Sequence, residues 1–377
     1  MILPPTDNLD CRWMHAALAL ARRGIGRTWP NPAVGCILIQ PGDPGCVVGR
    51  GWTQPGGRPH AETEALGRAG TAARGATAYL TLEPCAHVGK TAPCVDALIE
   101  RGVARVVIAL EDPDPRVSGA GIERLKKAGI KTDVGCLDEV ARQVNAGFLS
   151  RVNEGRPLVA WKTATTLDGK IAGIGHSQWI SGQGARARGH LLRARFDAIL
   201  TGMGTLMADD PQLTCRLPGL EDRSPIRVLM AGERPLPDKY KLLATGCKTP
   251  TWVYRVLEKT TNTKAQQLGD GVEVIPIAGI DLPDPAAVLA DLANRGITRV
   301  LIEAGASIAA SFFMENLIDE IHWFRAPNII GEGGVAAIGR LGNGKIKTME
   351  NFKCVGRCDI GVDTYEVYQR ELNENRC

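Results

Sequence analysis

The sequence predicts an α/β protein made of two domains. Its 377 residues exceed what one hydrophobic core usually organises. Short apolar runs alternate with segments of helical periodicity in both halves of the chain, which is the pattern of layered α/β folds. A polar segment that carries Gly and Pro, residues 151–157, separates the two halves. We therefore expect domains at residues 1–152 and 153–377.

Composition is typical of a globular protein and argues against several functional classes. Hydrophobic residues make up 44% and charged residues 23%, and 45 basic side chains nearly balance 41 acidic ones. This balance argues against a nucleic-acid partner, which selects a strongly basic surface. The sequence shows neither an apolar run of about 18 residues nor the charged-then-apolar start of a signal peptide. Eleven scattered cysteines then indicate reduced thiols, and we expect a cytoplasmic protein with no membrane partner.

In the first domain each expected element follows from a local signal. Asp10 can cap a helix with apolar residues on one face, and Pro30 and Pro32 keep the next segment extended. A turn rich in Pro and Gly at 41–45 joins two strands, and the run 103–110 is apolar enough for a strand covered on both faces. The expected helices are 10–23, 62–70, 93–101, 119–128 and 138–145, and the expected strands are 34–39, 46–52, 76–82, 103–110 and 130–134.

The second domain shows the same alternation with less regular spacing. Glycines and prolines mark turns at 167–170 and 209–211, and residues 335–377 alternate only weakly, which predicts one or two edge strands. Residues 198–205 are expected to form a strand that runs into a Gly-bearing turn, and residues 300–307 a strand, then Gly305, then the start of a helix. The remaining expected strands are 158–163, 226–230, 251–254, 272–277 and 321–325, and the remaining helices are 185–194 and 285–295.

Three possible metal ligands lie between residues 60 and 94. His60, Cys85 and Cys94 offer one imidazole and two thiols, and three protein ligands leave the fourth tetrahedral position of zinc open for water. Glu62 follows His60 by two residues, so it can reach that water without binding the metal and can carry a proton. This layout is typical of zinc nucleobase deaminases.

A purely structural interpretation competes with the metal site. A His-x-Glu triplet arises by chance, and buried cysteines are usually inert small hydrophobes. The usual deaminase spacing is Pro-Cys-x-x-Cys, whereas eight residues separate Cys85 from Cys94 in this chain. His87 is an alternative ligand, although the deaminase pattern has no place for it.

The longer spacing matches one family. Residues 81–94, Thr-Leu-Glu-Pro-Cys-Ala-His-Val-Gly-Lys-Thr-Ala-Pro-Cys, closely resemble the deaminase domain of the bifunctional riboflavin-biosynthesis deaminase/reductase, as does Pro-Asn-Pro-Ala-Val-Gly-Cys at 30–36. The resemblance implies a cytidine-deaminase-like three-layer fold, one zinc ion held by His60, Cys85 and Cys94, and Glu62 as the proton shuttle. It also implies that Asn31 contacts the pyrimidine or ribose, where a turn residue between prolines is the plainer alternative.

The second domain resembles the reductase half of the same family. The strand–Gly–helix segment at 303–307 could seat a phosphate, and it occurs with Thr-Leu-Asp-Gly at 166–169, Ser-Gln-Trp-Ile at 177–180 and Ala-Asp-Asp-Pro-Gln-Leu-Thr at 208–214. The resemblance implies a dihydrofolate-reductase-like α/β fold that uses NADPH. The implied cofactor-binding residues are Ala164, Trp179, Thr205, Asp209, Gly305, Ala306, Ser307, Ile308, Ala309, Ala310 and Ser311, and the implied substrate-binding residues are Ser177, Arg193, Leu213, Arg216 and Glu303.

The implied roles suit these residue types, although plainer alternatives exist. Arginine is the fork-shaped binder of phosphate oxygens, but Arg216 could be an ordinary surface arginine. Trp179 offers a flat face for stacking, or it could be a core aromatic. Thr166 and Asp114 replace the Ser and Asn that the family usually has. At Ala231-Gly232 the family commonly has Asp and a further polar residue, so the preference between NADPH and NADH stays open.

The resemblance implies a bifunctional enzyme of riboflavin biosynthesis. It would deaminate 2,5-diamino-6-ribosylamino-4(3H)-pyrimidinone 5′-phosphate hydrolytically with zinc, and then reduce the ribosyl group to a ribityl chain with NADPH. A small-molecule substrate and a homo-oligomer formed through the reductase domain are also expected. One alternative is a nucleobase or nucleic-acid deaminase with an accessory C-terminal domain, which the 5% aromatic content disfavours. Another is a non-catalytic zinc-stabilised binding protein, which would not need Glu62.

Overall fold

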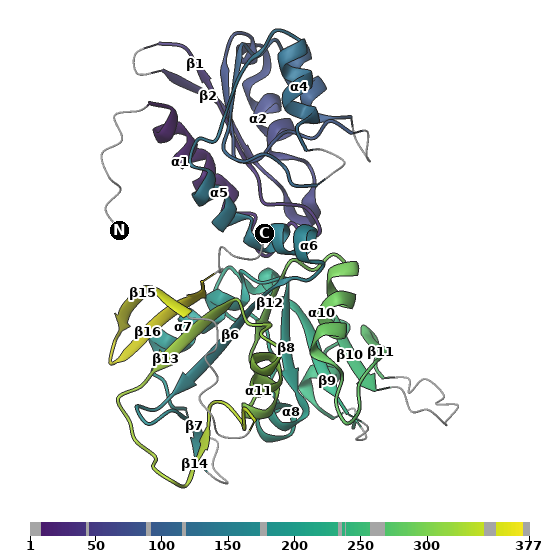
Figure 1. The fold of residues 1–377 in the computed structure, drawn as a ribbon, viewed down its shortest axis with the longest axis vertical. Coiled ribbons are helices and arrows are strands. Elements are labelled where there is room, and N and C mark those ends of the chain that lie inside the picture. Colours follow the sequence, from purple (N-terminus) through teal and green to yellow (C-terminus); the bar gives the residue numbers. More distant parts are fainter. Residues whose placement is uncertain are drawn as a thin grey trace. The chain divides into compact units, whose positions relative to one another are not determined.

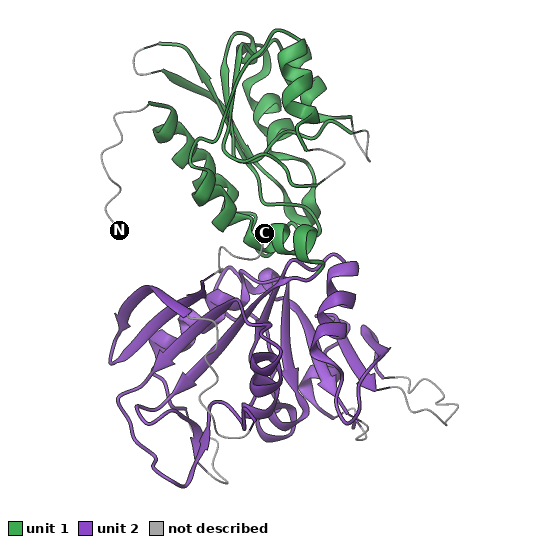
Figure 2. Ribbon diagram, in the orientation of Figure 1, with its two compact units in different colours: residues 1–155 green, residues 156–377 purple. Residues whose placement is uncertain are grey.

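Two compact units, Met1–Gly155 and Arg156–Cys377, make up the chain (Figure 2). The computed structural model describes residues 9–42, 45–87, 92–114, 118–173, 179–232, 236–237, 239–256, 268–342 and 352–371. Helix α6 (Ala146–Glu154) ends the first unit, and Gly155 follows it with φ 68°, a left-handed conformation that favours glycine. The boundary expected after residue 152 falls inside α6, a helix whose exposed, polar end resembles a linker in sequence. None of the helices in the described ranges has the length and apolar character to cross a bilayer.

A five-stranded mixed sheet forms the centre of the first unit (Figure 1). Its order is β2-β1-β3-β4-β5, with β1 antiparallel to both β2 and β3 and with β3, β4 and β5 parallel. The strands are β1 (Gly35–Gln40), β2 (Cys46–Trp52), β3 (Thr77–Leu80), β4 (Arg105–Ile108) and β5 (Lys131–Val134). The helices before α6 are α1 (Leu9–Ala21), α2 (Ala61–Ala69), α3 (Cys94–Glu100), α4 (Ala120–Lys127) and α5 (Asp138–Val144), with 3₁₀ turns at Pro55–Gly57 and Gly70–Ala73. Every element expected in this domain is present, and α6 is the addition.

Glycines let helices approach both faces of this sheet. A Cβ on Gly35 of β1 would lie 2.0 Å from the carbonyl oxygen of Ala17 in α1. A Cβ on Gly51 of β2 would lie 2.3 Å from the carbonyl oxygen of Ala61 in α2. Gly51 pairs with Cys36, the neighbour of Gly35, so the two glycines face opposite sides of the pleated sheet. The unit therefore has the three layers that the expected fold class requires, with α1 and α2 on opposite faces (Figure 1).

A nine-stranded sheet of order β11-β10-β9-β8-β12-β6-β13-β16-β15 forms the centre of the second unit (Figure 1). Neighbouring strands are parallel from β11 to β13, and β16 and β15 complete the sheet antiparallel. The strands are β6 (Leu158–Thr165), β8 (Ala198–Gly202), β9 (Ile226–Ala231), β10 (Thr251–Val256), β11 (Val272–Ile277), β12 (Arg299–Ile302), β13 (Glu320–Arg325), β15 (Phe352–Ile360) and β16 (Asp363–Arg370), and β7 (Lys170–Gly173) pairs separately with β14 (Gly334–Ala336). The helices are α7 (Gln183–Arg193), α8 (Met203–Asp209), α9 (Lys241–Ala244), α10 (Pro285–Asn294) and α11 (Ala306–Met314), with a 3₁₀ turn at Glu221–Arg223.

Several expectations for the second unit need correction. The strand expected over 198–205 ends at Gly202, where α8 begins, and the expected turn at 209–211 starts only after that helix. Short apolar runs do not distinguish a buried strand from the buried start of a helix, which explains this error. The segment 300–307 has the expected order of strand, Gly and helix, since β12 ends at Ile302 and α11 follows Gly305. In the C-terminal segment, β15 is an edge strand but β16 lies inside the sheet between β13 and β15.

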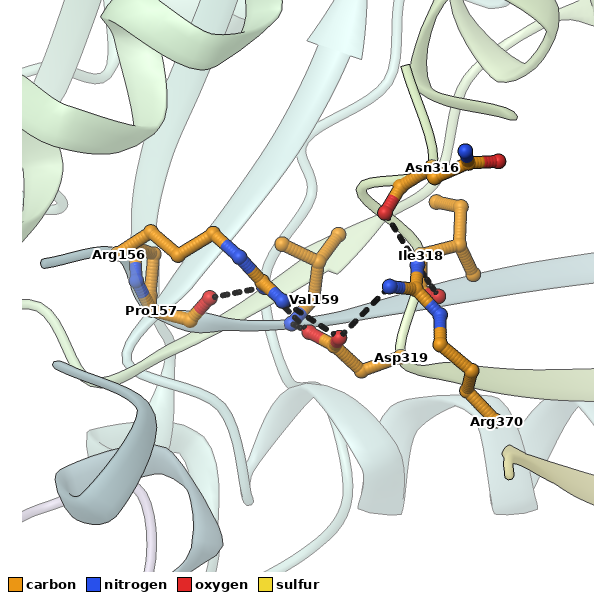
Figure 3. A network of polar contacts seen from close by, with 7 residues as sticks. All are labelled: Arg156, Pro157, Val159, Asn316, Ile318, Asp319 and Arg370. Carbon is orange, nitrogen blue, oxygen red and sulfur yellow. Dashed lines mark hydrogen bonds and ion pairs between the residues drawn. The ribbon is translucent and has the colours of Figure 1, made fainter. Parts of the chain in front are cut away.

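An ion-pair network fixes the first residues of the second unit (Figure 3). Arg156 donates to the two oxygens of Asp319 at 2.6 and 2.9 Å, and to the carbonyl oxygen of Pro157. Asp319 also accepts the backbone N–H of Val159 at 2.8 Å, and Arg370 lies 4.0 Å from it. The Arg156 and Asp319 side chains are only 17% and 20% exposed. Largely shielded, charge-assisted hydrogen bonds therefore join the starts of β6 and β13 to the end of β16.

We predict that Arg156→Leu lowers the free energy of unfolding of the second unit by about 1–3 kcal/mol, because Asp319 loses a two-pronged charged donor. Urea unfolding of the intact chain, with loss of reductase activity marking this unit, measures the change. Lys241→Leu is the control, since its pair with Asp210 lies in the same unit, is exposed (55% and 36%) and should contribute at most about 0.5 kcal/mol. Equal effects of the two substitutions would contradict the prediction.

Candidate metal centre and reductase site

Three separate elements bring the expected metal ligands together. His60 is the residue before α2, Cys94 is the first residue of α3, and Cys85 lies in the loop that follows β3. His60 Nδ1 lies 3.7 Å from Cys85 Sγ and 3.3 Å from Cys94 Sγ, and the three ligand atoms all lie within 4.8 Å of one another. The exposed His87 is not part of this group, so the alternative ligand is not supported.

The trio fits a tetrahedral zinc ion. Zinc–sulfur bonds of about 2.3 Å and zinc–nitrogen bonds of about 2.0 Å separate nitrogen and sulfur ligands by about 3.6 Å. The two measured nitrogen–sulfur distances lie on either side of that value. One nitrogen and two sulfurs also leave a fourth position, as catalytic zinc requires.

The two thiols interact strongly with each other. Their hydrogen bond lowers the pKa of the Cys85 thiol to about 4, against the opposing effect of burial. The same hydrogen bond, together with burial, raises the pKa of the Cys94 thiol. The backbone N–H of Cys94 also donates to Cys85 Sγ at 3.4 Å, as expected at the start of a helix. One proton is therefore shared between sulfurs that a metal cation would hold as two thiolates.

Glu62 lies in the first turn of α2 with its side chain buried. Its carboxyl group lies near Cys94, since it contributes to the raised pKa of that thiol. Burial raises the pKa of Glu62. The structure thus places a proton-carrying group beside the trio but outside it, as the sequence led us to expect.

Two further contacts support the loops of this site. The amide of Asn31 donates to the carbonyl oxygen of Gly57 at 2.8 Å, so it is held against the segment that leads to His60. Glu83, which sequence reasoning left without a role, is buried and accepts four backbone N–H groups at 2.8–3.2 Å, those of Asp112, Gly119, Gly121 and Ile122. It therefore ties the loop carrying Cys85 to the start of α4. A single sequence has no signal for this role, because the partners are backbone groups.

In the second unit several of the expected cofactor residues lie at one edge of the sheet. Ala164 lies near the carboxyl end of β6, and parallel strands β8 and β12 lead at the same edge into α8 and α11. A Cβ on Gly305 would lie 3.8 Å from Thr205 Oγ1, so the starts of these two helices are neighbours. No side chain caps the start of α11, which leaves backbone N–H groups suited to a phosphate.

Not every expected cofactor residue faces this edge. The side chains of Ile308, Ala309 and Ala310 are buried in the core, so only the first backbone N–H groups of α11 suit a ligand. Asp209 is exposed at the far end of α8. Trp179 is 78% exposed beneath the guanidinium of Arg186, which excludes its alternative role as a core aromatic.

The expected substrate residues surround a buried carboxylate. Glu303 receives two hydrogen bonds from Arg193, at 2.8 and 2.9 Å, and lies 3.5 Å from Lys162 Nζ. Burial opposes ionisation, but these two cations outweigh it and hold the pKa of Glu303 at about 2. Sequence reasoning missed Lys162, although a lysine directly after the apolar run 158–161, within one expected strand, was an available signal.

The other three expected substrate residues differ in exposure and in whether the structure describes them. Arg216 is exposed, and it pairs with no carboxylate in the described part of the chain. Leu213 is 2% exposed with φ 53°, so a ligand could meet its backbone but not its side chain. Ser177 lies outside the described residues.

Packing explains the unusual pair at the end of β9. Ala231 is fully buried, and a Cβ on Gly232 would lie 2.7 Å from the carbonyl oxygen of Asp281. A larger residue at either position would have to displace its neighbours. The absence of polar side chains here is thus compatible with the local structure of the reductase unit.

Comparisons with known proteins agree with this organisation. Residues 7–110 match the family model of the cytidine and deoxycytidylate deaminase zinc-binding region, and residues 157–365 match that of the RibD C-terminal domain. The riboflavin biosynthesis protein RibD of Aquifex aeolicus is 41% identical over 336 residues, which covers 89% of this chain and 91% of that protein. The chain belongs to the RibD family.

Solved structures extend the similarity to the whole chain. The structure of Acinetobacter baumannii RibD (form 2) has a TM-score of 0.85 at 36% identity and covers 96% of this chain and 99% of its own. That of the Thermotoga maritima diaminohydroxyphosphoribosylaminopyrimidine deaminase/5-amino-6-(5-phosphoribosylamino)uracil reductase has a TM-score of 0.83 at 32% identity, with coverage of 96% and 99%.

RibD membership confirms the expected fold class and general function. The first unit is cytidine-deaminase-like, the second is the α/β reductase domain, and the chain is a bifunctional deaminase and reductase of riboflavin biosynthesis that uses zinc and NADPH. The family favours this function over a nucleobase or nucleic-acid deaminase with an accessory domain. A non-catalytic zinc-stabilised binding protein is likewise not supported.

We predict one zinc ion per chain and a substantial loss of zinc in Cys94→Ser, because a hydroxyl is a poor replacement for a thiolate ligand. Metal analysis of the purified proteins measures the stoichiometry. Cys46→Ser is the control, since Cys46 is an exposed cysteine in the same unit and should leave zinc unchanged. Full zinc occupancy in Cys94→Ser would show that the ligand set is wrong.

Proposed function

We propose that the first unit hydrolytically removes the 2-amino group of 2,5-diamino-6-ribosylamino-4(3H)-pyrimidinone 5′-phosphate. We propose that the second unit then reduces the ribosyl group of the product to a ribityl chain. The observation that carries the first assignment is the convergence of His60, Cys85 and Cys94 beside the buried Glu62. The Thermotoga maritima relative, whose name specifies both activities, supports the pairing and order.

In the deaminase unit the roles follow from position. When bound, zinc supplies Lewis acidity that lets water act as a nucleophile at neutral pH. Glu62 lies near a ligand without belonging to the trio, so it is placed to carry a proton from water to the pyrimidine ring and then to the departing amine. Asn31, held by Gly57, is placed to orient the pyrimidine or ribose. Glu83 keeps the loop of Cys85 in position through backbone hydrogen bonds.

In the reductase unit the charged residues have different roles in binding the substrate. When bound, NADPH supplies the hydride for the reduction. The exposed Arg216 is a cation without a carboxylate partner in the described ranges, which suits the phosphate of the ribotide. Arg193 and Lys162 keep Glu303 ionised, so its carboxylate accepts hydrogen bonds from the substrate. Substrate and cofactor then meet at the carboxyl ends of parallel strands, where ligands of α/β proteins usually bind.

We also propose that copies of the chain associate through the reductase unit, and that the protein works in the cytoplasm. The nine-residue edge strand β15, with Val355 45% exposed, supports association because an edge offers unpaired backbone groups. The closely spaced Cys85 and Cys94 support a reducing compartment, because oxidation to a disulfide would remove two metal ligands.

Glu62→Gln should retain zinc and lose deamination by roughly 10² or more, because the amide keeps the shape but does not carry the proton. Reduction of the separately supplied deaminated intermediate should be nearly unchanged in the same preparation. Product formation is followed by mass spectrometry with and without NADPH. Deamination at the wild-type rate in this variant would exclude Glu62 as the shuttle.

Arg216→Ala should raise the KM for the deaminated ribotide roughly 10- to 150-fold, which corresponds to a lost charge-assisted contact of about 1.5–3 kcal/mol. The Kd for NADPH should change little, because no cofactor residue is expected at this position. Lys248→Ala is the control, since it removes an exposed cation of the same unit that lies outside the expected site and outside β15. Steady-state kinetics and NADPH titration separate the effects, and an unchanged KM in Arg216→Ala would refute the assignment. Arg193→Ala is a poorer test, since it also leaves Glu303 buried without its main partner.

A further inference from the structure

His190 contacts the backbone of the segment that carries Arg216. It lies on α7, one helical turn before Arg193, so both side chains project from the same face of the helix. The backbone N–H of Arg216 donates to His190 Nδ1 at 3.3 Å, and the carbonyl oxygen of Thr214 lies 3.1 Å from the same nitrogen. Neither the sequence pattern nor the proposed site assigns a role to this histidine.

The surrounding hydrogen bonds indicate which form of His190 this arrangement needs. Thr214 already accepts a hydrogen bond from Arg193 Nη1 at 3.0 Å. Within the described ranges, His190 Nδ1 is the acceptor found for the backbone N–H of Arg216. A protonated Nδ1 donates to the Thr214 carbonyl, whereas an Nδ1 with a lone pair accepts the Arg216 N–H. Only the second form satisfies both backbone groups, because Thr214 already has a donor; it is the neutral imidazole protonated on the other ring nitrogen.

The segment from 213 to 216 is otherwise held at only a few points. It begins at Leu213, a buried residue in the left-handed region with φ 53°, where a side chain is strained. The backbone N–H of Cys215 donates to Ser224 Oγ at 3.1 Å. His190 and Arg193 therefore hold the side of the segment that faces α7, and His190 fixes the residue whose guanidinium is left exposed.

We propose that His190 is a positioning residue of the reductase, which holds the backbone of Arg216 so that the guanidinium meets the substrate phosphate. This inference rests on the proposed function, because Arg216 must be a substrate residue for its placement to matter. His190 acts through Arg216 and does not itself touch the reacting atoms.

The same geometry predicts a dependence on pH. The groups that face His190 are Arg193 on its own helix, Arg216 on the segment, and Glu303 after β12, itself paired with Lys162. Burial and the charges of the two arginines lower the pKa of His190, against the weaker opposite effects of the Thr214 carbonyl and of Glu303. The imidazole is therefore neutral at neutral pH. As pH falls through this lowered pKa, Nδ1 gains a proton, no longer accepts the Arg216 N–H, and the KM for the ribotide rises.

The test compares His190→Leu, which removes the acceptor, with His190→Asn, whose Oδ1 occupies the place of Nδ1. In the full-length enzyme, His190→Leu should raise the KM for the deaminated ribotide about fivefold to tenfold, with kcat and the Kd for NADPH within about twofold. His190→Asn should restore most of the wild-type KM. The unchanged kcat and Kd for NADPH check the folding of the reductase unit, and deamination, which depends on the other unit, should also be unchanged.

Two further measurements decide whether His190 acts as proposed. In an Arg216→Ala background, His190→Leu should add little to the KM, because the residue that it positions is already gone. The rise in KM at acid pH should be weaker in His190→Asn than in the wild type, and any rise that both share belongs to the substrate phosphate, which titrates near pH 6.

Three results would overturn the proposal. They are an unchanged KM in His190→Leu, a KM in His190→Asn as high as in His190→Leu, or a full effect of His190→Leu in the Arg216→Ala background. An unchanged KM in the single variant Arg216→Ala would instead refute the proposed substrate assignment on which the inference rests.

Discussion

The close contact between α2 and β2 is the constraint on which the deaminase site depends. Gly49 and Gly51 face this helix, and a Cβ on either would lie 2.3 Å from one of its carbonyl oxygens. The helix therefore rests almost directly on the strand backbone. Because His60 precedes α2 and Glu62 lies in its first turn, the depth of this helix sets the position of both. Their partners Cys85 and Cys94 are carried by other elements, so a helix raised from the sheet would separate the trio.

In the reductase unit, a crossover in the strand order has a similar effect. Strand β12 follows α10 in sequence but lies between β8 and β6 in the sheet. Its carboxyl end therefore brings Glu303 next to Lys162 on β6 and within reach of Arg193 on α7. A buried carboxylate is tolerated there because two cations compensate its charge. The same edge carries the uncapped start of α11, so charged groups and backbone N–H groups face a common region.

Sequence reasoning succeeded where chemistry and spacing are local. His60, Glu62, Cys85 and Cys94 lie within one short stretch and have few common roles together, so their convergence was predictable. It failed where a role depends on backbone partners far along the chain. Glu83 accepts N–H groups from residues 112–122, and His190 contacts residues 214–216, yet neither pairing leaves a mark on the side-chain pattern. The contact of Lys162 with Glu303 and the burial of the α11 residues were missed for a related reason. Which face of a strand or helix is covered depends on the elements packed against it.

The sequence by itself predicted the two-part α/β organisation, the trio of possible metal ligands that the structure brings together, and the family, because these depend on residue types and motifs that are local in sequence. The tertiary structure alone decided the order of strands, the interior place of β16, and the burial of Leu213, Ile308 and Ala231. It also decided that Arg193 is committed to Glu303 while Arg216 stays exposed. The physical reason is that burial and charge pairing arise between segments distant in sequence, and one chain records the residues but not which of them meet.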